Sequence, residues 1–388
     1  MRMHLRLGLL GGIAFPFLLT LSFSQAVYSQ PADKQAKLLD RQAKLQAALN
    51  DPGYTHFNCE GADAECLVSE TPAPGVRMVR PKDYPIRPAH YLSSNLYTTL
   101  AADRETGNRF NAFDFQVPPE GGPLPHTHHN EWETFFVSDG VMKFTELDSN
   151  PPYNYILLDE PAGTVVYGSL GPVHGFQNKT TSKGRIFSFA MPAGLDQFFH
   201  NAGEEVVDYN APIPAISMEE IVRTAFWAEQ RGDSLWFLGA PPPVIPAGNP
   251  QPVISSANDA RRPTETGPFG EKRVVLLSPT EVGNVTGATA FCGPGRPGRP
   301  GGSVKYTYLT MPNQQGDFPT AFTSQNTEVF YTLGGNLSFR FGGFLGNSVT
   351  AEPGTFIQID PGVPFSIANL SSAAAQSLGI SVISPVCP

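Results

Sequence analysis

The chain has 388 residues, more than one hydrophobic core usually holds, so two domains are expected. Its formal net charge of −9 makes it a poor candidate for binding nucleic acid or an anionic membrane. Glycine and proline number 38 each, and this abundance favours many short strands joined by turns. Beyond the N-terminus, no run of residues is long and apolar enough to span a bilayer.

The first 26 residues have the pattern of an export signal. Arg2 and Arg6 form a short basic region, an apolar run follows from Leu7 to Phe23, and small residues after it suit a signal peptidase. An uncleaved anchor helix is the alternative, although Pro16 and two glycines interrupt the run. We therefore expect a secreted or periplasmic protein, with no membrane partner after cleavage of residues 1–26.

Four cysteines follow the signal, which is an even number in an oxidising compartment. Cys59 and Cys66 are close enough to close a small local loop, and by elimination Cys292 would then pair with Cys387. Metal-binding thiolates are the alternative, but the chain has no pair of cysteines at CxxC spacing to support it.

Residues 27–75 are expected to form an N-terminal helical arm that also carries the Cys59–Cys66 loop. Residues 31–50 have strong helix propensity, and a repeated Gln-Ala-Lys-Leu places Leu38 and Leu45 on one face. Two heptads are too few to predict a coiled coil, so a solvated helix is expected. A packing arm or a short dimer contact is the alternative.

Short strands with turn signals dominate residues 76–210, as in the segments 110–117, 134–137, 155–158 and 185–191. Residues 211–265 break this pattern. Ser217 with Glu220 three positions later predicts the start of a helix that runs to about Gln230, and the proline-rich segment 241–246 predicts an extended linker. Strands resume at residues 272–278 and continue to the end.

Five of the eight histidines fall between residues 126 and 200. His126 and His128 are two apart, so on a strand both side chains point to the same face and can share one ion. Glu133 lies at an odd offset from His128, so the intervening chain must bend or bulge for Glu133 to join them. Glu131 is the competing carboxylate and His129 the competing imidazole, and the spacing does not choose between them.

His174 follows in a second segment, Gly-Pro-Val-His-Gly. Three imidazoles and a carboxylate can hold a first-row transition metal and leave positions open for other ligands. Accidental clustering is one alternative, and a closed structural metal site is another. Outside this set, His129 and His200 are expected to lie behind the ligands or on the surface.

The two segments resemble the two motifs of the cupin family. The residues at matching spacing are His126, His128, Glu133 and Gly140 in the first motif, and Gly163, Ser169, Gly171, His174 and Asn178 in the second. Ser169 stands where the family usually has proline. The resemblance implies that His126, His128, Glu133 and His174 bind one divalent transition metal ion (Cu, Fe, Mn, Ni or Co) inside a small antiparallel jelly-roll barrel.

The C-terminal part repeats the same spacing without the histidines. Glu328 and Gly335 mirror the first motif, and residues 354–369 mirror the second. The positions of the three histidines are taken by Ala321, Thr323 and Phe365. The resemblance therefore implies an all-β bicupin with two tandem barrels. Its parts are a helical N-terminal segment, a metal-binding cupin domain over 76–210, a partly helical connector over 211–265, and a degenerate cupin domain without metal over 266–388.

Among bicupins, the arrangement resembles the flavonol 2,4-dioxygenases, or quercetinases, over roughly residues 80–388. Residues 191–199, which include Leu195, resemble a stretch after their second motif, and Phe135 and Phe176 match aromatic positions that line the flavonol pocket. Both phenylalanines could equally be core residues. The resemblance implies a dioxygenase that opens the heterocycle of a flavonol such as quercetin, with dioxygen as co-substrate. Glu133 would be the general base that deprotonates the substrate.

Three other functions are compatible with parts of the pattern. An oxalate-type decarboxylase or oxidase usually keeps metal ligands in both barrels, which this chain does not. A cupin oxidoreductase or cyclase acting on another phenolic metabolite would have the same motifs. A non-catalytic binding bicupin would have no need of an intact ligand set. A homodimer is expected from the family resemblance and from the heptad-like arm.

Overall fold

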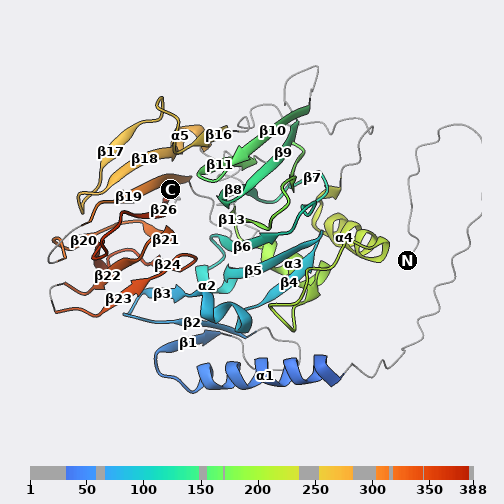
Figure 1. Cartoon of the computed structure of the whole chain (residues 1–388), viewed down its shortest axis with the longest axis horizontal. Coiled ribbons are helices and arrows are strands. Elements are labelled where there is room, and N and C mark those ends of the chain that lie inside the picture. Colours follow the sequence, from blue (N-terminus) through green and yellow to red (C-terminus); the bar gives the residue numbers. More distant parts are fainter. Residues whose placement is uncertain are drawn as a thin grey trace, which may run out of the picture.

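The structure is a computed structural model that describes residues 32–57, 66–147, 155–168, 171–235, 253–282, 303–313, 318–343 and 345–383. Four antiparallel sheets make up most of it, two in each half of the molecule. Figure 1 shows the N-terminal strands, from cyan to green, beside the C-terminal strands, from yellow to red. The expected all-β architecture is confirmed, with two sheets in each half.

The N-terminal half consists of an eight-stranded and a five-stranded sheet. The larger sheet has the order β14 (Glu204–Glu205), β4 (Ala89–Leu92), β5 (Asn95–Ala101), β6 (Asn111–Val117), β13 (Gly184–Met191), β8 (Trp132–Asp139), β11 (Thr164–Gly168), β16 (Val253–Ser256). The smaller sheet has the order β10 (Tyr155–Pro161), β9 (Val141–Leu147), β12 (His174–Asn178), β7 (His126–Thr127), β15 (Ser234–Leu235). Both sheets contribute phenylalanines to one buried core, among them Phe113, Phe115, Phe144 and Phe176.

The C-terminal half consists of a nine-stranded and a four-stranded sheet. The larger has the order β1 (Tyr54–Phe57), β2 (Leu67–Glu70), β3 (Val76–Val79), β24 (Phe356–Ile359), β21 (Thr327–Gly334), β26 (Ala375–Ile383), β19 (Ser303–Met311), β18 (Lys272–Leu277), β17 (Thr264–Thr266). The smaller has the order β20 (Phe322–Thr323), β25 (Pro364–Ala368), β22 (Leu337–Phe341), β23 (Ser348–Ala351).

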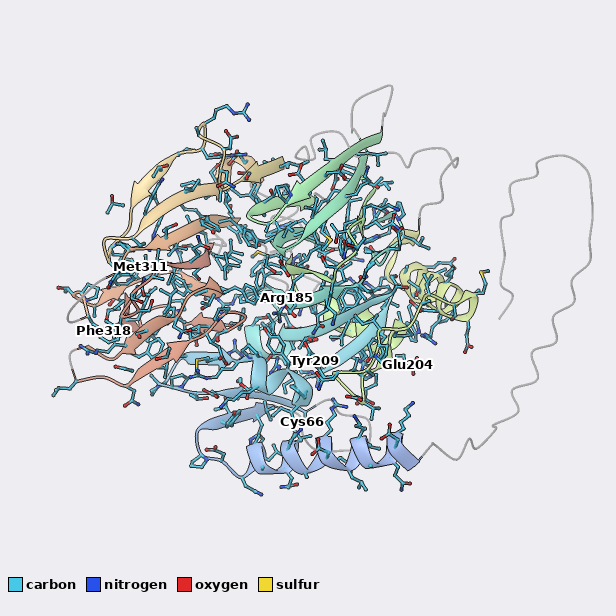
Figure 2. All side chains as sticks on the ribbon, viewed as in Figure 1. Cys66, Arg185, Glu204, Tyr209, Met311 and Phe318 are labelled. Atoms are coloured by element: carbon cyan, nitrogen blue, oxygen red, sulfur yellow. The ribbon has the colours of Figure 1, made fainter. Side chains whose placement is uncertain are left out.

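The two halves exchange strands. The early strand β3 pairs with β24 of the C-terminal half, and β16, from the segment after the first half, pairs with β11. The two large sheets also share a core, in which the rings of Phe187 and Tyr331 lie 4.7 Å apart. Figure 2 shows Arg185 at this junction, where its guanidinium and the Tyr331 hydroxyl both contact Asp114. The halves therefore form one continuous body.

Helices lie outside the sheets. They are α1 (Ala32–Leu49), the 3-10 helix η1 (Pro81–Ile86), α2 (Asp103–Thr106), α3 (Leu195–Ala202), α4 (Met218–Arg231) and α5 (Pro279–Val282). The helix predicted from Ser217 is confirmed as α4, because the Ser217 hydroxyl accepts a hydrogen bond from the Glu220 N–H at 3.1 Å. Among the described helices, none has the length and hydropathy to cross a membrane.

The predicted N-terminal helix is confirmed as α1, which runs along the outside of the molecule (Figure 1). Leu38 is exposed, whereas Leu45 packs against the buried Ala48 and Val68, so the two leucines of the repeat have different surroundings. Lys37 and Arg41 form ion pairs with Asp208 and Glu205. The helix is thus a packing arm rather than a fully solvated one.

Several predictions concern residues outside the described ranges. The export signal over residues 1–26, the linker over 241–246, and Cys59, Cys292 and Cys387 all lie there. The pairing of the cysteines and export from the cell therefore stay predictions. The homodimer also stays a prediction, because the structure describes a single chain.

Candidate metal centre

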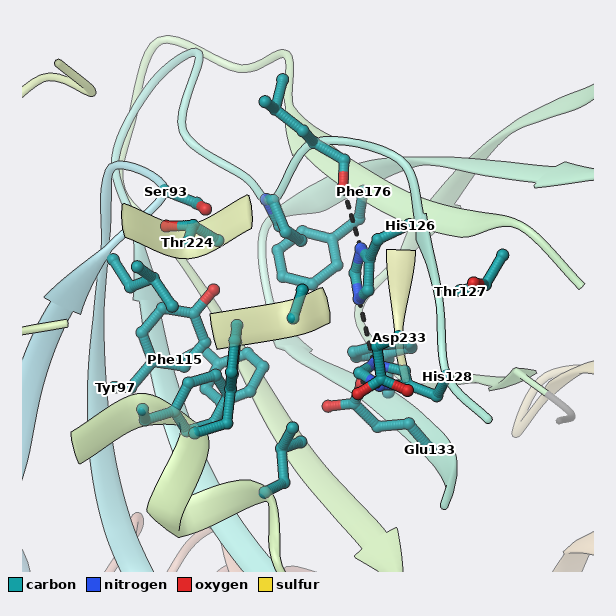
Figure 3. Close-up of a pocket in the computed structure, with 18 of the residues that line it drawn as sticks. Ser93, Tyr97, Phe115, His126, Thr127, His128, Glu133, Phe176, Thr224 and Asp233 are labelled. Atoms are coloured by element: carbon teal, nitrogen blue, oxygen red, sulfur yellow. Dashed lines mark hydrogen bonds and ion pairs between the residues drawn. The ribbon is translucent and has the colours of Figure 1, made fainter. Parts of the chain in front are cut away.

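Four side chains from three segments of the chain converge inside the N-terminal half. His126 lies on β7 and pairs in register with His174 on β12, so the two imidazoles are neighbours in the small sheet. Glu133 comes from β8 in the large sheet opposite. The ligand atoms of His126, His128, Glu133 and His174 all lie within 4.8 Å of one another. Figure 3 shows three of these side chains, His126, His128 and Glu133, on one side of a pocket.

The odd spacing between His128 and Glu133 has a simple structural origin. His128 follows the end of β7 in the small sheet, and Glu133 is the second residue of β8 in the large sheet. The chain between them passes from one sheet to the other, which is the bend that the spacing required. Because the two sheets face each other, Glu133 meets the histidines from the opposite side.

Backbone carbonyls orient two of the imidazoles. The Nδ1 atom of His126 lies 2.8 Å from the Leu124 carbonyl oxygen, and that of His174 lies 3.3 Å from the Pro172 oxygen. A carbonyl oxygen can only accept, so each Nδ1 carries the hydrogen and each Nε2 presents a lone pair to the centre. The Nε2 atoms of His126 and His128 are 3.0 Å apart.

Burial sets the charge of these rings. Removal from water, with the nearby His128 charge, lowers the pKa of His126 to about 3. The same causes hold the pKa of His174 well below its ordinary value. Both rings are thus neutral at physiological pH, which is the form that binds metal. For His128, burial also lowers the pKa, but the carboxylates of Asp233, Glu131 and Glu133 outweigh it and raise the value well above the ordinary one.

Glu133 is buried, and a hydrogen bond holds one of its two carboxylate oxygens. Its Oε1 accepts a hydrogen bond from the Ser188 hydroxyl at 2.6 Å. Its Oε2 lies 3.4 Å from Nε2 of His128 and 3.9 Å from Nε2 of His174. The Nε2 atom of His174 is buried without any hydrogen-bond partner. A buried nitrogen lone pair left unsatisfied beside two imidazoles and a carboxylate fits a divalent transition ion, so this cluster could hold a metal.

The competing residues lie elsewhere. Glu131 faces the outer nitrogen of His128, with its Oε1 atom 3.2 Å from Nδ1. His129 turns towards the Thr127 hydroxyl, 3.3 Å from its Nε2, and the His200 ring packs against His90. The structure therefore separates Glu133, which faces the centre, from Glu131, which does not.

Two residues that the sequence did not point to complete this region. Asp233 and Arg231 follow one another closely at the end of α4, in the segment that the sequence analysis assigned to a connector. His128, Glu131 and Asp233 form a second group with metal-ligand geometry, but the Arg231 guanidinium contacts Glu131 at 2.5 Å and Asp233 at 3.0 Å. This cation forms ion pairs with both carboxylates, so the group forms an ion network. No spacing rule in the sequence connects residues 131 and 233.

A pocket opens beside the four-residue cluster. Aromatic and aliphatic side chains from α3, α4 and both sheets make most of its wall, including all three predicted pocket residues, Phe135, Phe176 and Leu195. Other apolar lining residues are Leu92, Tyr97, Phe115, Phe198, Phe199, Ile221 and Ala228. The described residues that line it include no lysine or arginine. The pocket therefore suits an apolar molecule better than an anion.

Tyr97 contributes a polar group to this wall. The Asn95 amide nitrogen donates both to the Ser93 carbonyl, at 3.1 Å, and to the Tyr97 hydroxyl oxygen, at 3.0 Å. Since the carbonyl can only accept, the amide is fixed and the Tyr97 oxygen acts as acceptor. Among the described residues, none accepts the Tyr97 hydroxyl hydrogen. Figure 3 shows Tyr97 across the pocket from His128 and Glu133.

The corresponding region of the C-terminal half contains different side chains. Phe322 on β20 pairs in register with Phe365 on β25, as His126 pairs with His174. This pairing places Phe322, rather than the expected Ala321, at the counterpart of His126. Glu328 is held by the hydroxyls of Ser324 and Ser381, at 2.6 and 2.7 Å. Within the described residues of this half, no three ligating side chains gather.

Comparison with known proteins identifies the fold. No family model and no curated protein matches the sequence. A putative glyoxylate-induced protein from Pseudomonas aeruginosa is similar in structure, with a TM-score of 0.51 and 12% identity over 81% of this chain and 90% of that chain. The Escherichia coli protein Ylba has a TM-score of 0.48 at 10% identity, covering 81% and 93% of the two chains.

Bacillus subtilis oxalate decarboxylase has a TM-score of 0.47 at 13% identity, covering 78% of this chain and 75% of its own. At 12% identity, the similarity to the Pseudomonas aeruginosa protein shows the fold alone. The chain has the two-domain, all-β cupin fold.

Proposed function

We propose that this two-domain cupin protein is a metal-dependent dioxygenase that opens the heterocycle of a flavonol such as quercetin. The observation that carries the proposal is that a buried cluster of three histidines and a glutamate borders a pocket with a mostly aromatic and aliphatic wall. A substrate in this pocket would present one edge to the cluster and its rings to the aromatic side chains.

The metal would be one divalent transition ion (Cu, Fe, Mn, Ni or Co) held by His126, His128, His174 and Glu133. When bound, such an ion lowers the pKa of a coordinated hydroxyl and supplies the electronic coupling that a reaction with dioxygen needs. The donor set of nitrogen and carboxylate oxygen does not distinguish among these ions.

Glu133 is the proposed general base. Its Oε2 atom faces the cluster and is the nearest carboxylate oxygen to the imidazole Nε2 atoms, so it can accept the proton of a substrate hydroxyl bound there. The Ser188 hydroxyl holds the other oxygen, which keeps Oε2 directed at the reacting position. Loss of the proton leaves an electron-rich enolate on the substrate, the form that reacts with dioxygen.

The pocket wall orients the substrate and excludes water. The rings of Phe135 and Phe176 lie 5.3 Å apart and border the cluster, so a flat substrate can pack against them. At the other side, the Tyr97 hydroxyl has a hydrogen to donate to a substrate oxygen. A flavonol has both an apolar ring system and oxygen atoms at opposite ends, and it therefore matches this distribution.

Oxalate is a poorer match for the pocket. A small dianion needs cationic or multiple donor groups around it, and the described lining residues include no lysine or arginine. Another phenolic metabolite would fit the same pocket, so a cupin oxidoreductase or cyclase acting on such a substrate is the alternative. The experiment below tests it by including non-flavonol phenols.

The test measures dioxygen consumption by protein of known metal content. Purified protein is loaded with each candidate ion and mixed in turn with quercetin, other flavonols, non-flavonol phenols and oxalate. The proposal expects that metal-loaded protein consumes dioxygen and releases carbon monoxide when it is given a flavonol. Metal-free protein should do neither. Turnover of oxalate alone, or a protein that binds no transition metal, would overturn it.

A further inference from the structure

We propose that Asp233, Glu131 and Arg231 are positioning residues for His128, and that the end of α4 thereby forms part of the metal site. The inference rests on the proposed function in one respect, that the histidine cluster binds a metal ion. Glu131 lies within the first motif segment but is not one of its matching residues, and Asp233 and Arg231 lie about 100 residues after His128 in the chain.

His128 differs from the other two histidines in what its outer nitrogen meets. The Nδ1 atoms of His126 and His174 face backbone carbonyls. The Nδ1 atom of His128 faces two carboxylates, with Glu131 Oε1 at 3.2 Å and Asp233 Oδ2 at 3.7 Å. Both contacts are ion pairs rather than hydrogen bonds, since Nδ1 of His128 has no hydrogen-bond partner. The two negative charges nonetheless favour the hydrogen on Nδ1 and increase the donor strength of Nε2.

Arg231 keeps the two buried carboxylates in place. Its Nη2 atom lies 2.5 Å from Glu131 and its Nε atom 3.0 Å from Asp233. The same guanidinium donates to the Gly194 carbonyl and lies 5.7 Å from the centre of the Phe198 ring. These contacts fix the arginine, and its charge offsets the cost of burying two acidic groups beside one imidazole.

The C-terminal end of α4 determines where Asp233 lies. Gly232 has a φ of 82°, a left-handed conformation that glycine adopts without strain, and the Asp233 N–H donates to the Ala228 carbonyl at 2.9 Å. On the other side, the His129 N–H donates to Asp233 Oδ1 at 2.8 Å. The aspartate is therefore tied both to the helix and to the residue next to His128. Such rigid placement is what a positioning residue needs.

The experiment measures metal affinity in full-length variants. Cobalt(II) is titrated into metal-free natural protein, Asp233→Asn, Glu131→Gln and the double variant, and binding is followed by the visible absorption of the bound ion. Each single change should weaken binding by about 10- to 100-fold and shift the absorption bands, since the donor strength of His128 changes. The double variant should be weaker than either.

A matched control removes a buried carboxylate from the other half. Glu328→Gln should leave both the cobalt affinity and the spectrum unchanged, because Glu328 lies in the other half, where the hydroxyls of Ser324 and Ser381 hold its carboxylate. Circular dichroism of each metal-free variant shows whether it is folded. Asp233→Glu, which retains the charge, should restore part of the affinity.

The outcomes separate this inference from the proposed function. If the natural protein binds cobalt and the folded Asp233→Asn and Glu131→Gln variants bind it equally well with the same spectrum, the positioning role is wrong and the metal site stands. If the natural protein binds none of the candidate metals, both are wrong. Equal weakening in the Glu328→Gln control would also overturn the positioning role, because the effect would then be general.

Discussion

The two halves of the molecule share a scaffold and differ in the chemistry at its centre. Asn178 in the first half donates to the carbonyls of Val117 and Ser182, and Asn369 in the second donates to those of Met311 and Ala373. Gly140 and Gly335 both adopt positive φ, each at the corresponding turn of its own half. Where the first half has a histidine pair across two strands, the second has a pair of phenylalanines.

This difference teaches that the cupin motif contains two separable sets of residues. Glycines and the asparagine shape turns and satisfy backbone groups, and both halves contain them. The clustered histidines are found in the first half alone, where a pocket lies beside them. In the second half, the buried Phe365 and the exposed Phe322 occupy the corresponding positions, with their ring centres 5.9 Å apart.

The largest effects on metal binding and on stability are expected when His174 in the first half, or its counterpart Phe365 in the second, is replaced by alanine. His174→Ala removes a buried ligand and should abolish stoichiometric metal binding, as measured by elemental analysis. Its counterpart Phe365→Ala should leave the metal content intact but lower the free energy of unfolding by about 3–5 kcal/mol, because it removes a buried ring. Full metal content in His174→Ala would show that this histidine is not a ligand.

A second comparison concerns the two glutamates. Glu133→Gln should reduce turnover by about 10²- to 10⁴-fold, the usual contribution of a general base, while most of the metal is retained. Steady-state dioxygen uptake and metal analysis on the same sample measure both quantities. Glu328→Gln should change neither. If Glu133→Gln keeps full activity, another group takes the proton.

A smaller effect is expected from the tyrosine hydroxyls. Tyr97→Phe removes the donor in the pocket wall and should raise the KM for a flavonol by about two- to tenfold, the worth of one hydrogen bond. Tyr306→Phe is the matched control, because the Tyr306 hydroxyl bonds to Thr134 in the core between the two large sheets. An unchanged KM in Tyr97→Phe would mean that the substrate does not reach this hydroxyl.

The smallest effect concerns an acidic pair found in the first half. Burial, together with the nearby Asp103, raises the pKa of Asp196 to about 7. The raised value means that the stability from this group is present below the unfolded pKa near 3.8 and is lost as the pH rises through 7. Asp196→Asn stays neutral and should be more stable than the natural protein at pH 8, with a smaller difference at pH 5.

Urea unfolding at pH 5 and pH 8 measures this dependence. The natural protein and the Asp196→Asn variant are compared at each pH, with Asn201→Gln as a non-titrating control on the same helix. A difference between Asp196→Asn and the natural protein that is the same at both pH values would exclude titration of Asp196 as its cause.

Local sequence was sufficient to predict some features. Alternating apolar residues indicated the strands, and the Ser217–Glu220 pair indicated α4, because strand faces and helix caps depend on neighbours within a few residues. The four clustered residues could also be named in advance, since two motifs with fixed spacing resembled a known family.

Other features depended on contacts between distant parts of the chain. Spacing alone left Glu131 and Glu133 as competing carboxylates, and the position of β7 and β8 in facing sheets explains why Glu133 is the one that meets the histidines. The exchange of β3 and β16 between the halves, and the approach of Asp233 and Arg231 to His128, join residues far apart in sequence. Spacing fixes which way a side chain points from its own strand, but only tertiary packing decides which other side chains it meets.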